Sequence, residues 1–192
     1  MQRCHWVGND PSMMEYHDRE WGVPLHDDTK LFEFLTLEGA QAGLSWSTIL
    51  HKRDNYRKAF DHFDIQKVAR YTSNDLERLM ENPGIVRNRS KIISAVENAG
   101  KIIEIQREYG SFDAFIWYFA KETPIPDAME NKTVPPSQSH ESVIMSRELK
   151  KRGFKFVGPV ICYSFMQAVG MVNDHITTCF RYKELLKVPD NS

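Results

Sequence analysis

The 192-residue chain is predicted to fold as an all-α protein. Apolar residues recur at intervals of three and four along most of its length, and side chains at that spacing share one face of a helix. The apolar–polar alternation that would indicate strands appears nowhere convincingly. With 41% hydrophobic and 27% charged residues the chain has the composition of an ordinary globular protein, so we expect one domain over residues 1–192.

Polar capping residues and a glycine mark the first predicted helices. Residues 27–29, Asp-Asp-Thr, can cap a helix that ends near Gly43, because their side-chain oxygens accept hydrogen bonds from its first N–H groups. Ser47 can cap a second helix that runs to about Phe60. The apolar residues of the first helix fall on one face, and Glu38 falls on that same face.

Helix breakers separate the later elements. Short helices can start at Asp64 and at Ser73, and the sequence Asn-Pro-Gly at 82–84 then interrupts the chain. Residues 89–109 carry apolar side chains at helical spacing, which predicts a long amphipathic helix, and an aromatic helix follows it. Residues 123–140 contain four prolines and many polar residues, so we expect an irregular connection within the domain.

Cysteine usage and hydropathy predict a cytoplasmic protein. The three cysteines lie far apart in the sequence, which argues against a disulfide framework and agrees with a reducing compartment. No apolar run approaches the roughly 18 residues that a membrane span requires, and the first residues have no apolar segment typical of a signal peptide. We therefore expect no membrane partner, and a monomer, since no helix has an obvious extra apolar face.

Four residues near the two ends of the chain are candidate zinc ligands. Cys4 and His17 lie at the start, whereas His175 and Cys179 lie near the end, four residues apart and so on one side of a helical turn. A site in which protein fills all four positions has no open position for water or substrate, so a zinc ion here would be structural. Buried cysteines and hydrogen-bonded histidines without a metal are equally compatible with this spacing.

A basic turn between two predicted helices is a candidate DNA contact. The net charge of −1 offers no general attraction for a polyanion, so any affinity for DNA must come from a local patch. Residues 142–170 predict a helix-hairpin-helix, in which glycines let backbone N–H groups approach a phosphate. An ordinary helical hairpin with solvated basic residues is the alternative. A second basic turn, residues 83–91, can add phosphate contacts. The residues expected to contact DNA in the hairpin are Lys151, Gly153, Lys155, Phe156, Val157 and Gly158, with further positive charge from Lys150 and Arg152.

Glu38 is a candidate ligand-binding residue because the helical periodicity would bury its carboxylate. An unpaired buried charge is unfavourable, so a nearby arginine, a helix N-terminus or hydrogen-bond donors on a ligand must compensate it. The surrounding sequence is rich in large rings, and aromatic walls with one carboxylate suit a flat purine. The rings considered are Trp6, Tyr16, Trp21 and Trp46.

Five segments, in order along the chain, resemble the motifs of the DNA-3-methyladenine glycosylase I family. They are Arg-Cys-His-Trp at 3–6, residues 16–24 and 37–46, the hairpin residues 150–158, and Asn-Asp-His at 173–175. The resemblance implies a helix-hairpin-helix DNA glycosylase fold with a structural zinc ion joining the N- and C-terminal segments. It also implies hydrolytic removal of 3-methyladenine from alkylated double-stranded DNA, with the free base as product ligand and an abasic site left behind.

The resemblance also assigns roles to individual residues. The zinc ligands fall on Cys4, His17, His175 and Cys179, and base recognition falls on Glu38, Tyr16 and Trp46, with Trp6 and Trp21 nearby. The ionised carboxylate of Glu38 would accept a hydrogen bond from the exocyclic amine and favour a cationic base, which makes it the candidate catalytic residue. We expect burial to raise its pKa. Gln41 and Leu44 are candidates to fill the gap that the extracted base leaves in the duplex.

Three other functions remain for comparison. A bifunctional glycosylase/lyase would need a lysine amine, and no lysine follows the hairpin before Lys183. A zinc deaminase is disfavoured because its His-x-Glu and Cys-x-x-Cys elements are missing. A non-enzymatic DNA-binding module stabilised by zinc would use the hairpin alone, but it leaves Glu38 unexplained.

Asp174 follows the hairpin and is a candidate to activate water, although we favour a structural role in which it orients a zinc ligand.

Overall fold

The computed structural model describes residues 1–121 and 136–186. Over these ranges every regular element is a helix and no strand occurs, so the predicted all-α class is confirmed. No helix in the same ranges combines the length and the apolar character needed to cross a membrane. The α-helices are α1 (Pro11–Arg19), α2 (Asp28–Gln41), α3 (Trp46–Ala59), α4 (Ile65–Val68), α5 (Ser73–Glu81), α6 (Arg89–Tyr109), α7 (Phe112–Lys121), α8 (His140–Lys151), α9 (Pro159–Ala168) and α10 (Phe180–Leu185), and the 3-10 helices are η1 (His5–Val7) and η2 (Asp61–Phe63).

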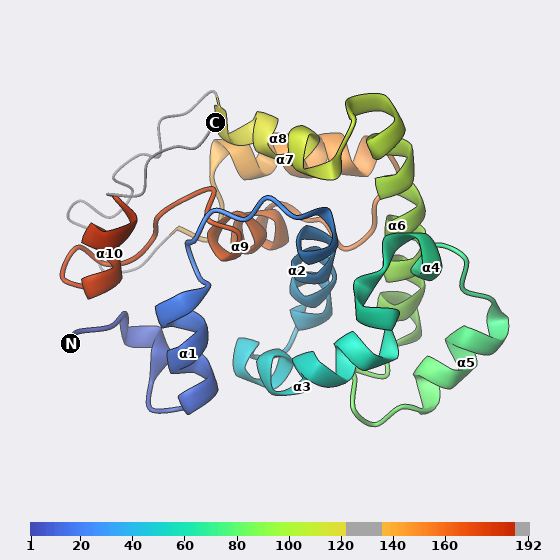
Figure 1. Ribbon diagram of the computed structural model, residues 1–192, viewed down its shortest axis with the longest axis horizontal. Helices are drawn as coiled ribbons and strands as arrows, with labels where there is room; N and C mark the ends of the chain where they lie inside the picture. Colours follow the sequence, from blue (N-terminus) through green and yellow to red (C-terminus); the bar gives the residue numbers. More distant parts are fainter. Residues whose placement is uncertain (122–135, 187–192) are drawn as a thin grey trace.

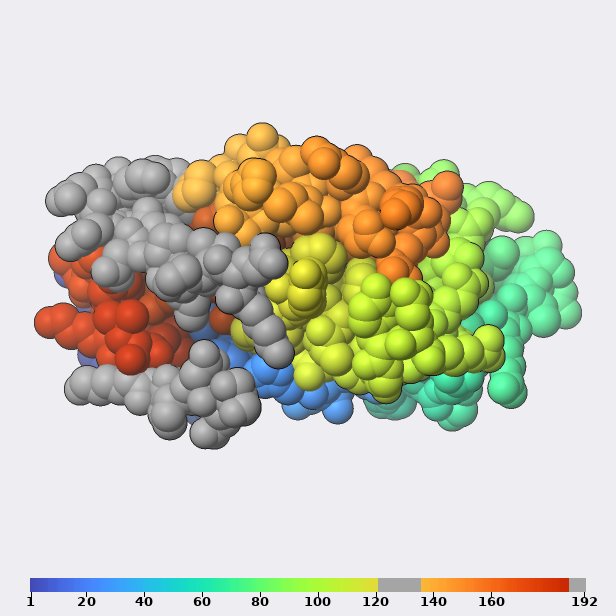
Figure 2. Space-filling model, turned by 90° about the horizontal axis from the view of Figure 1, so that it is seen from above, coloured from blue at the N-terminus to red at the C-terminus, as the bar shows by residue number. Residues whose placement is uncertain are grey.

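Helix α2 forms the centre of the molecule. Figure 1 shows it with α9 on one side, α3 across its end and the long helix α6 on the other side. Figure 2, seen from above, shows α7 (yellow) and α8 (orange) next to each other across one face. Because neighbours surround it, α2 is buried without interruption from Leu31 to Ala40. The single apolar face expected from the sequence is therefore extended around the whole helix.

The helix starts differ from the predicted ones by one or two residues. Ser45, rather than Ser47, caps α3, because its hydroxyl accepts a hydrogen bond from the Thr48 N–H group at 3.2 Å. Thr72 caps α5 in a capping box with Asp75, so Ser73 is the first helical residue and not the cap. These corrections arise because serine and threonine at neighbouring positions offer the same hydroxyl.

Helix α1 was not predicted, although the sequence carried its start signal. Asp10 caps it by accepting from the Ser12 N–H group at 2.8 Å, and Pro11 occupies its first turn. Most of the predicted irregular connection at 123–140 lies outside the described residues, and its last residue, His140, begins α8.

The chain after α1 packs against the end of α9. The Gly22 N–H group donates to the Gln167 carbonyl at 3.0 Å, and the Leu25 N–H group donates to the Val169 carbonyl at 3.1 Å. Gly170 ends this contact with a φ of +76°, and a Cβ atom at that position would lie 2.3 Å from the carbonyl carbon of Val23. Only glycine fits there, since both the backbone conformation and the space exclude a side chain.

The variant Gly170→Ala tests this close approach. We expect its free energy of unfolding to fall by at least about 2 kcal/mol, because the methyl group overlaps backbone and the φ is left-handed. Gly100→Ala in the interior of α6 is the control: a Cβ there meets nothing within 4 Å, so alanine should stabilise the helix by roughly 0.5–1 kcal/mol. Urea-induced unfolding of both variants measures the difference, and effects of the same sign would contradict the packing described.

Candidate functional site

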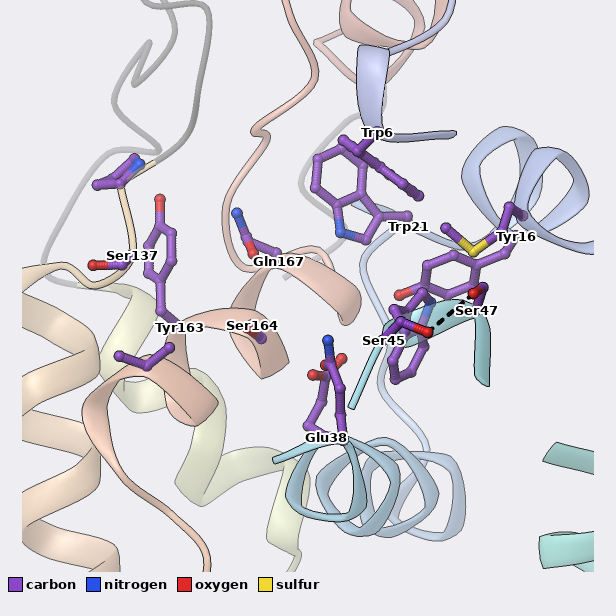
Figure 3. A pocket seen from close by; sticks show the side chains of 15 residues that line it. Trp6, Tyr16, Trp21, Glu38, Ser45, Ser47, Ser137, Tyr163, Ser164 and Gln167 are labelled. Carbon is purple, nitrogen blue, oxygen red and sulfur yellow. Dashed lines mark hydrogen bonds between the residues drawn. The ribbon is translucent and has the colours of Figure 1, made fainter. Parts of the chain in front are cut away.

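A cavity of about 540 Å³ lies between the N-terminal helices and α9. Its walls come from η1, α1, the end of α2, the start of α3, and α9 across the opening (Figure 3). The structure therefore brings together segments that are separated by more than a hundred residues in the sequence. The lining residues are Trp6, Met13, Tyr16, Trp21, Glu38, Gln41, Ser45, Trp46, Ser47, Pro136, Ser137, Val160, Tyr163, Ser164 and Gln167.

All four predicted aromatic residues line this cavity. The rings of Trp6 and Trp21 meet edge to face with centroids 4.9 Å apart, and those of Tyr16 and Trp46 lie 5.2 Å apart. Tyr16 and Trp21 are buried, whereas Trp6 is 37% exposed at the rim. The indole N–H of Trp46 is buried and has no hydrogen-bond partner in the described chain. Together the rings form the walls of a slot for a flat, largely apolar molecule with an acceptor for that N–H group.

Glu38 extends from α2 into the cavity (Figure 3). Its side chain is only 5% exposed, and no described residue forms a hydrogen bond or an ion pair with its carboxylate. Burial alone raises the pKa of this carboxyl to about 8. The predicted burial and the predicted direction of the pKa shift are both confirmed. The carboxylate therefore faces the cavity without a hydrogen-bond donor from the described residues, so a ligand or water can supply one.

A buried arginine lies near the cavity but does not neutralise Glu38. The guanidinium of Arg53 donates to Glu33 at 2.5 Å and to Glu20 at 2.7 Å, and it stacks over the Phe34 ring at 4.8 Å. Its positive charge is thus already balanced by two other carboxylates. Of the explanations considered for the burial of Glu38, pairing with a nearby arginine is excluded.

The wall opposite Glu38 contains residues that sequence reasoning missed. Tyr163 and Gln167 come from α9, and both donate to one carboxylate oxygen of Asp174, at 2.6 and 2.7 Å. The other oxygen of Asp174 is buried and has no partner in the described chain. Asp174 therefore fixes the cavity wall and forms no hydrogen bond with a histidine of the described chain, which contradicts the expectation that it orients a zinc ligand. Only its position in the chain was visible in the sequence, because its partners are set by the packing of α9.

The four candidate metal ligands form one buried cluster. Their ligand atoms all lie within 4.8 Å of one another. The Cys179 sulfur lies 3.4 Å from Nε2 of His17 and 3.6 Å from Nδ1 of His175, and the Cys4 sulfur lies 3.5 Å from the same Nδ1. A tetrahedral zinc ion with ordinary bond lengths separates a nitrogen and a sulfur ligand by about 3.6 Å. The residues therefore fit such an ion, whereas the neighbouring His5 is exposed and lies outside the cluster.

The two imidazoles of the cluster are in the protonation state that a metal requires, whereas the Cys4 thiol must lose its proton to bind one. Burial lowers the pKa of His175 to about 4 and also lowers that of His17, so both imidazoles are neutral and can act as ligands. Burial raises the pKa of the Cys4 thiol to about 12, which is unfavourable for a thiolate unless a cation binds it.

Outer contacts fix the orientation of both imidazoles. Nδ1 of His17 lies 2.8 Å from the Asp18 carboxylate, and a hydrogen bond from Arg3 is the main reason that the pKa of Asp18 falls to about 2. Nε2 of His175 donates to the Trp21 carbonyl at 3.0 Å. Such contacts select the tautomer that presents the other ring nitrogen to a metal. Trp21 also lines the cavity, so one residue of the cavity wall is in direct contact with the cluster.

The predicted DNA-contacting turn joins α8 to α9 on the surface. Gly153 ends α8 with a φ of +91°, Phe154 and Val157 are buried beneath the turn, and Lys151 and Lys155 are exposed, as the sequence indicated. Phe156 is half-buried and packs against the position of Gly39 on α2, where an added Cβ atom would lie 3.3 Å from its own Cβ. Gly158 precedes the first turn of α9 with open space around it.

Two basic residues that were expected to supply free charge are bound to the protein instead. Arg152 pairs with Glu108 at 2.6 Å and with Glu148 at 3.1 Å, so its charge is balanced. Lys91, in the second basic turn, donates to backbone carbonyls at the end of α2. The guanidinium of Arg152 and the ammonium group of Lys91 therefore already have protein partners and are not free to bind phosphate. Gln41 and Leu44 were expected to fill the gap that the extracted base leaves in the duplex. In the structure Gln41 lines the cavity, and Leu44 is 42% exposed in the loop beyond α2.

Comparison with known proteins gives consistent matches over almost the whole chain. A model of the methyladenine glycosylase family matches residues 6–182. The DNA-3-methyladenine glycosylase 1 of Escherichia coli (strain K12) is 48% identical over 182 residues, which cover 95% of this chain and 97% of that protein.

Two solved structures share the fold. A crystal structure of a 3-methyladenine DNA glycosylase I has a TM-score of 0.88 at 50% sequence identity, and the match covers 93% of this chain and 98% of that one. A structure of the Staphylococcus aureus 3-methyladenine DNA glycosylase I, described as the structural basis of 3-methyladenine recognition, has a TM-score of 0.88 at 39% identity and covers 93% and 95% of the two chains.

The raised pKa of Glu38 predicts a specific pH dependence of stability. The folded chain keeps this carboxyl protonated to about pH 8, whereas an unfolded chain ionises it near 4.5. Between these values the unfolded state has lost a proton that the folded state retains, so the contribution of Glu38 to stability falls as pH rises, by at most about 1.4 kcal/mol per pH unit. Glu38→Gln removes this contribution.

Urea-induced unfolding of the wild type and of Glu38→Gln at a series of pH values measures the effect. We expect the stability of the variant relative to the wild type to increase steadily between about pH 5 and pH 8 and to level off above that range. A difference that stays constant with pH would show that the Glu38 carboxyl titrates normally in the folded chain.

Proposed function

This chain belongs to the methyladenine glycosylase family, and on that premise we propose that its aromatic cavity binds 3-methyladenine turned out of alkylated DNA. The chain is a DNA glycosylase that removes 3-methyladenine from DNA by hydrolysing the bond between base and sugar, which leaves an abasic site. A base inside a duplex cannot reach such a cavity, so the nucleotide must be extruded from the stack before the bond breaks.

The observation that carries this proposal is the unpaired, buried carboxylate of Glu38 among four aromatic rings. Methylation at N3 gives the adenine of the nucleotide a positive charge. Aromatic faces attract such a cation, and the Glu38 carboxylate attracts it more strongly in a cavity that excludes water. The exocyclic amine of the base can donate the hydrogen bond that no described residue supplies to Glu38.

The same arrangement disfavours ordinary adenine. A neutral base brings no positive charge, so Glu38 would stay protonated at neutral pH, because burial alone holds its pKa near 8. The cationic base is also the better leaving group, since it departs as a neutral molecule and needs little acid assistance. In this proposal Glu38 acts by electrostatics: it stabilises the positively charged base and then the positive charge that develops on the sugar as the bond breaks.

The turn between α8 and α9 is the proposed contact to the duplex, used as a helix-hairpin-helix. The N–H groups of Phe156, Val157 and Gly158 donate to no group in the described chain, and Lys151 and Lys155 are exposed beside them. Backbone N–H groups at the start of a helix bind phosphate oxygens without reading base sequence. Gln41, which lines the cavity, and Leu44, which is exposed in the loop beyond α2, are proposed to occupy the space of the extruded nucleotide.

A structural zinc ion is the proposed occupant of the cysteine and histidine cluster. The separations between the ligand atoms and the neutral imidazoles support a tetrahedral site with two sulfur and two nitrogen ligands, Cys4, Cys179, His17 and His175. Its contribution is stability, because it cross-links the two ends of the chain. The protein residues around it position Trp21 through the contact with His175, and so shape the cavity.

Release of free base separates this function from the alternative of a zinc-stapled DNA-binding module. We expect chromatography of methylated DNA incubated with the protein to show free 3-methyladenine, and Glu38→Gln to lower the single-turnover rate at least about tenfold, since a neutral amide cannot balance the cation. Thr36→Val is the matched control, because Thr36 is a buried residue of α2 whose hydroxyl has no partner in the described chain.

Two outcomes would contradict the assignment. Wild-type excision by Glu38→Gln would place base recognition elsewhere, and release of no base by the wild-type protein would favour the binding module. Equal losses in Glu38→Gln and Thr36→Val would mean that any change in this part of α2 damages the protein.

Metal analysis tests the zinc proposal without reference to activity. We expect about one zinc ion for each purified chain, and we expect Cys179→Ala to lose it and to unfold at lower temperature. Cys162→Ala is the control, because Cys162 is also buried but lies outside the cluster, so this variant should keep its zinc. Retention of zinc by Cys179→Ala would contradict the proposed set of ligands.

A further inference from the structure

One face of α6 contacts both segments that are proposed to meet DNA. Figure 1 shows the coil between α8 and α9 passing beside this helix. Lys91 and Asn98 are seven residues apart on α6, which is two turns and about 10.5 Å along the axis. Lys91 reaches the loop beyond α2, and Asn98 reaches the turn before α9. The sequence analysis placed Lys91 in a basic turn expected to contact phosphate and did not single out Asn98.

Asn98 holds the turn by its backbone. It is 5% exposed, its amide nitrogen donates to the Lys155 carbonyl at 3.0 Å, and its amide oxygen accepts from the Lys155 N–H group at 2.9 Å. Both the amide nitrogen and the amide oxygen of the side chain therefore bind the backbone of one residue of the turn. This contact leaves the Lys155 side chain free while it fixes the peptide units on either side.

The consequence of this contact is the direction of the next N–H groups. Phe156 follows Lys155 with a φ of +53°, a left-handed conformation that is unfavourable for a residue with a side chain. The Ser146 hydroxyl then holds the Val157 carbonyl from beneath at 2.6 Å. With the carbonyls of residues 155 and 157 held inward, the N–H groups of residues 156–158 remain unpaired by the described chain. Asn98 thus stabilises a strained turn in the form that can bind phosphate.

Lys91 holds the second segment. Its ammonium group donates to the Ala40 carbonyl at 2.8 Å and to the Ala42 carbonyl at 2.6 Å. These carbonyls lie at the C-terminal end of α2, where no further helical turn supplies N–H partners and where a positive charge is favourable. The loop that begins there turns through Gly43, with a φ of +80°, and presents Leu44. Burial lowers the pKa of this ammonium group.

We infer that Lys91 and Asn98 are positioning residues, which fix the loop carrying Leu44 and the turn at 155–158 at a set separation along α6. This inference rests on the proposed function of both segments in DNA binding. Extruding a nucleotide requires the duplex to be gripped by its phosphates while another group enters the stack, so the two contacts must keep a constant distance. A helix is suited to this task because it is rigid over two turns.

Three variants of α6 test the inference. Asn98→Ala should weaken binding of a duplex with an abasic-site analogue about tenfold, because the turn loses a buried hydrogen-bond pair. Lys91→Met should lower the single-turnover excision rate at saturating DNA about tenfold, with a smaller change in DNA affinity, because the loop acts after the duplex is bound. Both should bind free 3-methyladenine as tightly as the wild type does, since neither side chain lines the cavity.

Ser94→Ala is the matched control. Ser94 lies between the two residues on α6 and is 6% exposed, but its hydroxyl donates only to the Lys91 carbonyl within the helix, at 2.7 Å. This variant should match the wild type in all three measurements. The inference is overturned if Asn98→Ala and Lys91→Met match it too, or if both lose affinity for the free base in parallel with DNA function. Lys91 is only partly buried, so Lys91→Met keeps the test open should Asn98→Ala fail to fold.

A variant of the turn itself separates this inference from the proposed function. Gly158→Val places a side chain where a phosphate would approach, and a Cβ atom at Gly158 meets no other group within 4 Å. Unchanged DNA affinity in Gly158→Val would refute the turn as a phosphate contact, and with it the basis of the inference. Weakened affinity in Gly158→Val with normal affinity in Asn98→Ala and a normal excision rate in Lys91→Met would refute the positioning role alone.

Discussion

The structure depends on one unfavourable placement, a carboxylate buried in an aromatic cavity without a partner. Glu38 stands on the central helix, and desolvation raises its pKa to about 8. The ionised form of such a carboxyl group is poorly stabilised, and a cationic base that donates a hydrogen bond from its amine can stabilise it. Under the proposed function, the pocket would therefore gain more from binding a methylated purine than from binding the neutral parent. In that proposal, selectivity follows from the unpaired carboxyl group of Glu38 as much as from the shape of the cavity.

The surrounding helices keep Glu38 without a partner, because their own charged groups pair with other residues. Arg53 is a buried cation that could in principle pair with Glu38, but its guanidinium donates to Glu20 and Glu33 instead. On the opposite wall, Asp174 receives hydrogen bonds from Tyr163 and Gln167, which keeps two polar side chains of α9 in fixed positions. Arg53 and Asp174 thus have partners of their own, whereas no described residue pairs with the carboxylate of Glu38.

The ends of the chain are held by a second constraint that connects with the first. The cysteine and histidine cluster joins residues more than 150 positions apart, and its His175 donates to the carbonyl of Trp21, a residue of the cavity wall. Stability at the termini and the shape of the pocket are therefore linked. The turn before α9 is linked in a similar way, because Phe156 packs against Gly39, next to Glu38 on α2.

The sequence by itself determined the helical class, most of the helices, the family, and the residue types of the pocket and cluster, because periodicity, capping residues and long motifs are local properties. It placed Glu38 on a buried face and gathered four rings near it. Only the tertiary structure decided the partners: Arg152 meets Glu108 and Glu148, Lys91 caps α2, and Asp174 faces α9. Such pairs depend on how distant helices pack, and no local pattern specifies which side chains that packing brings together.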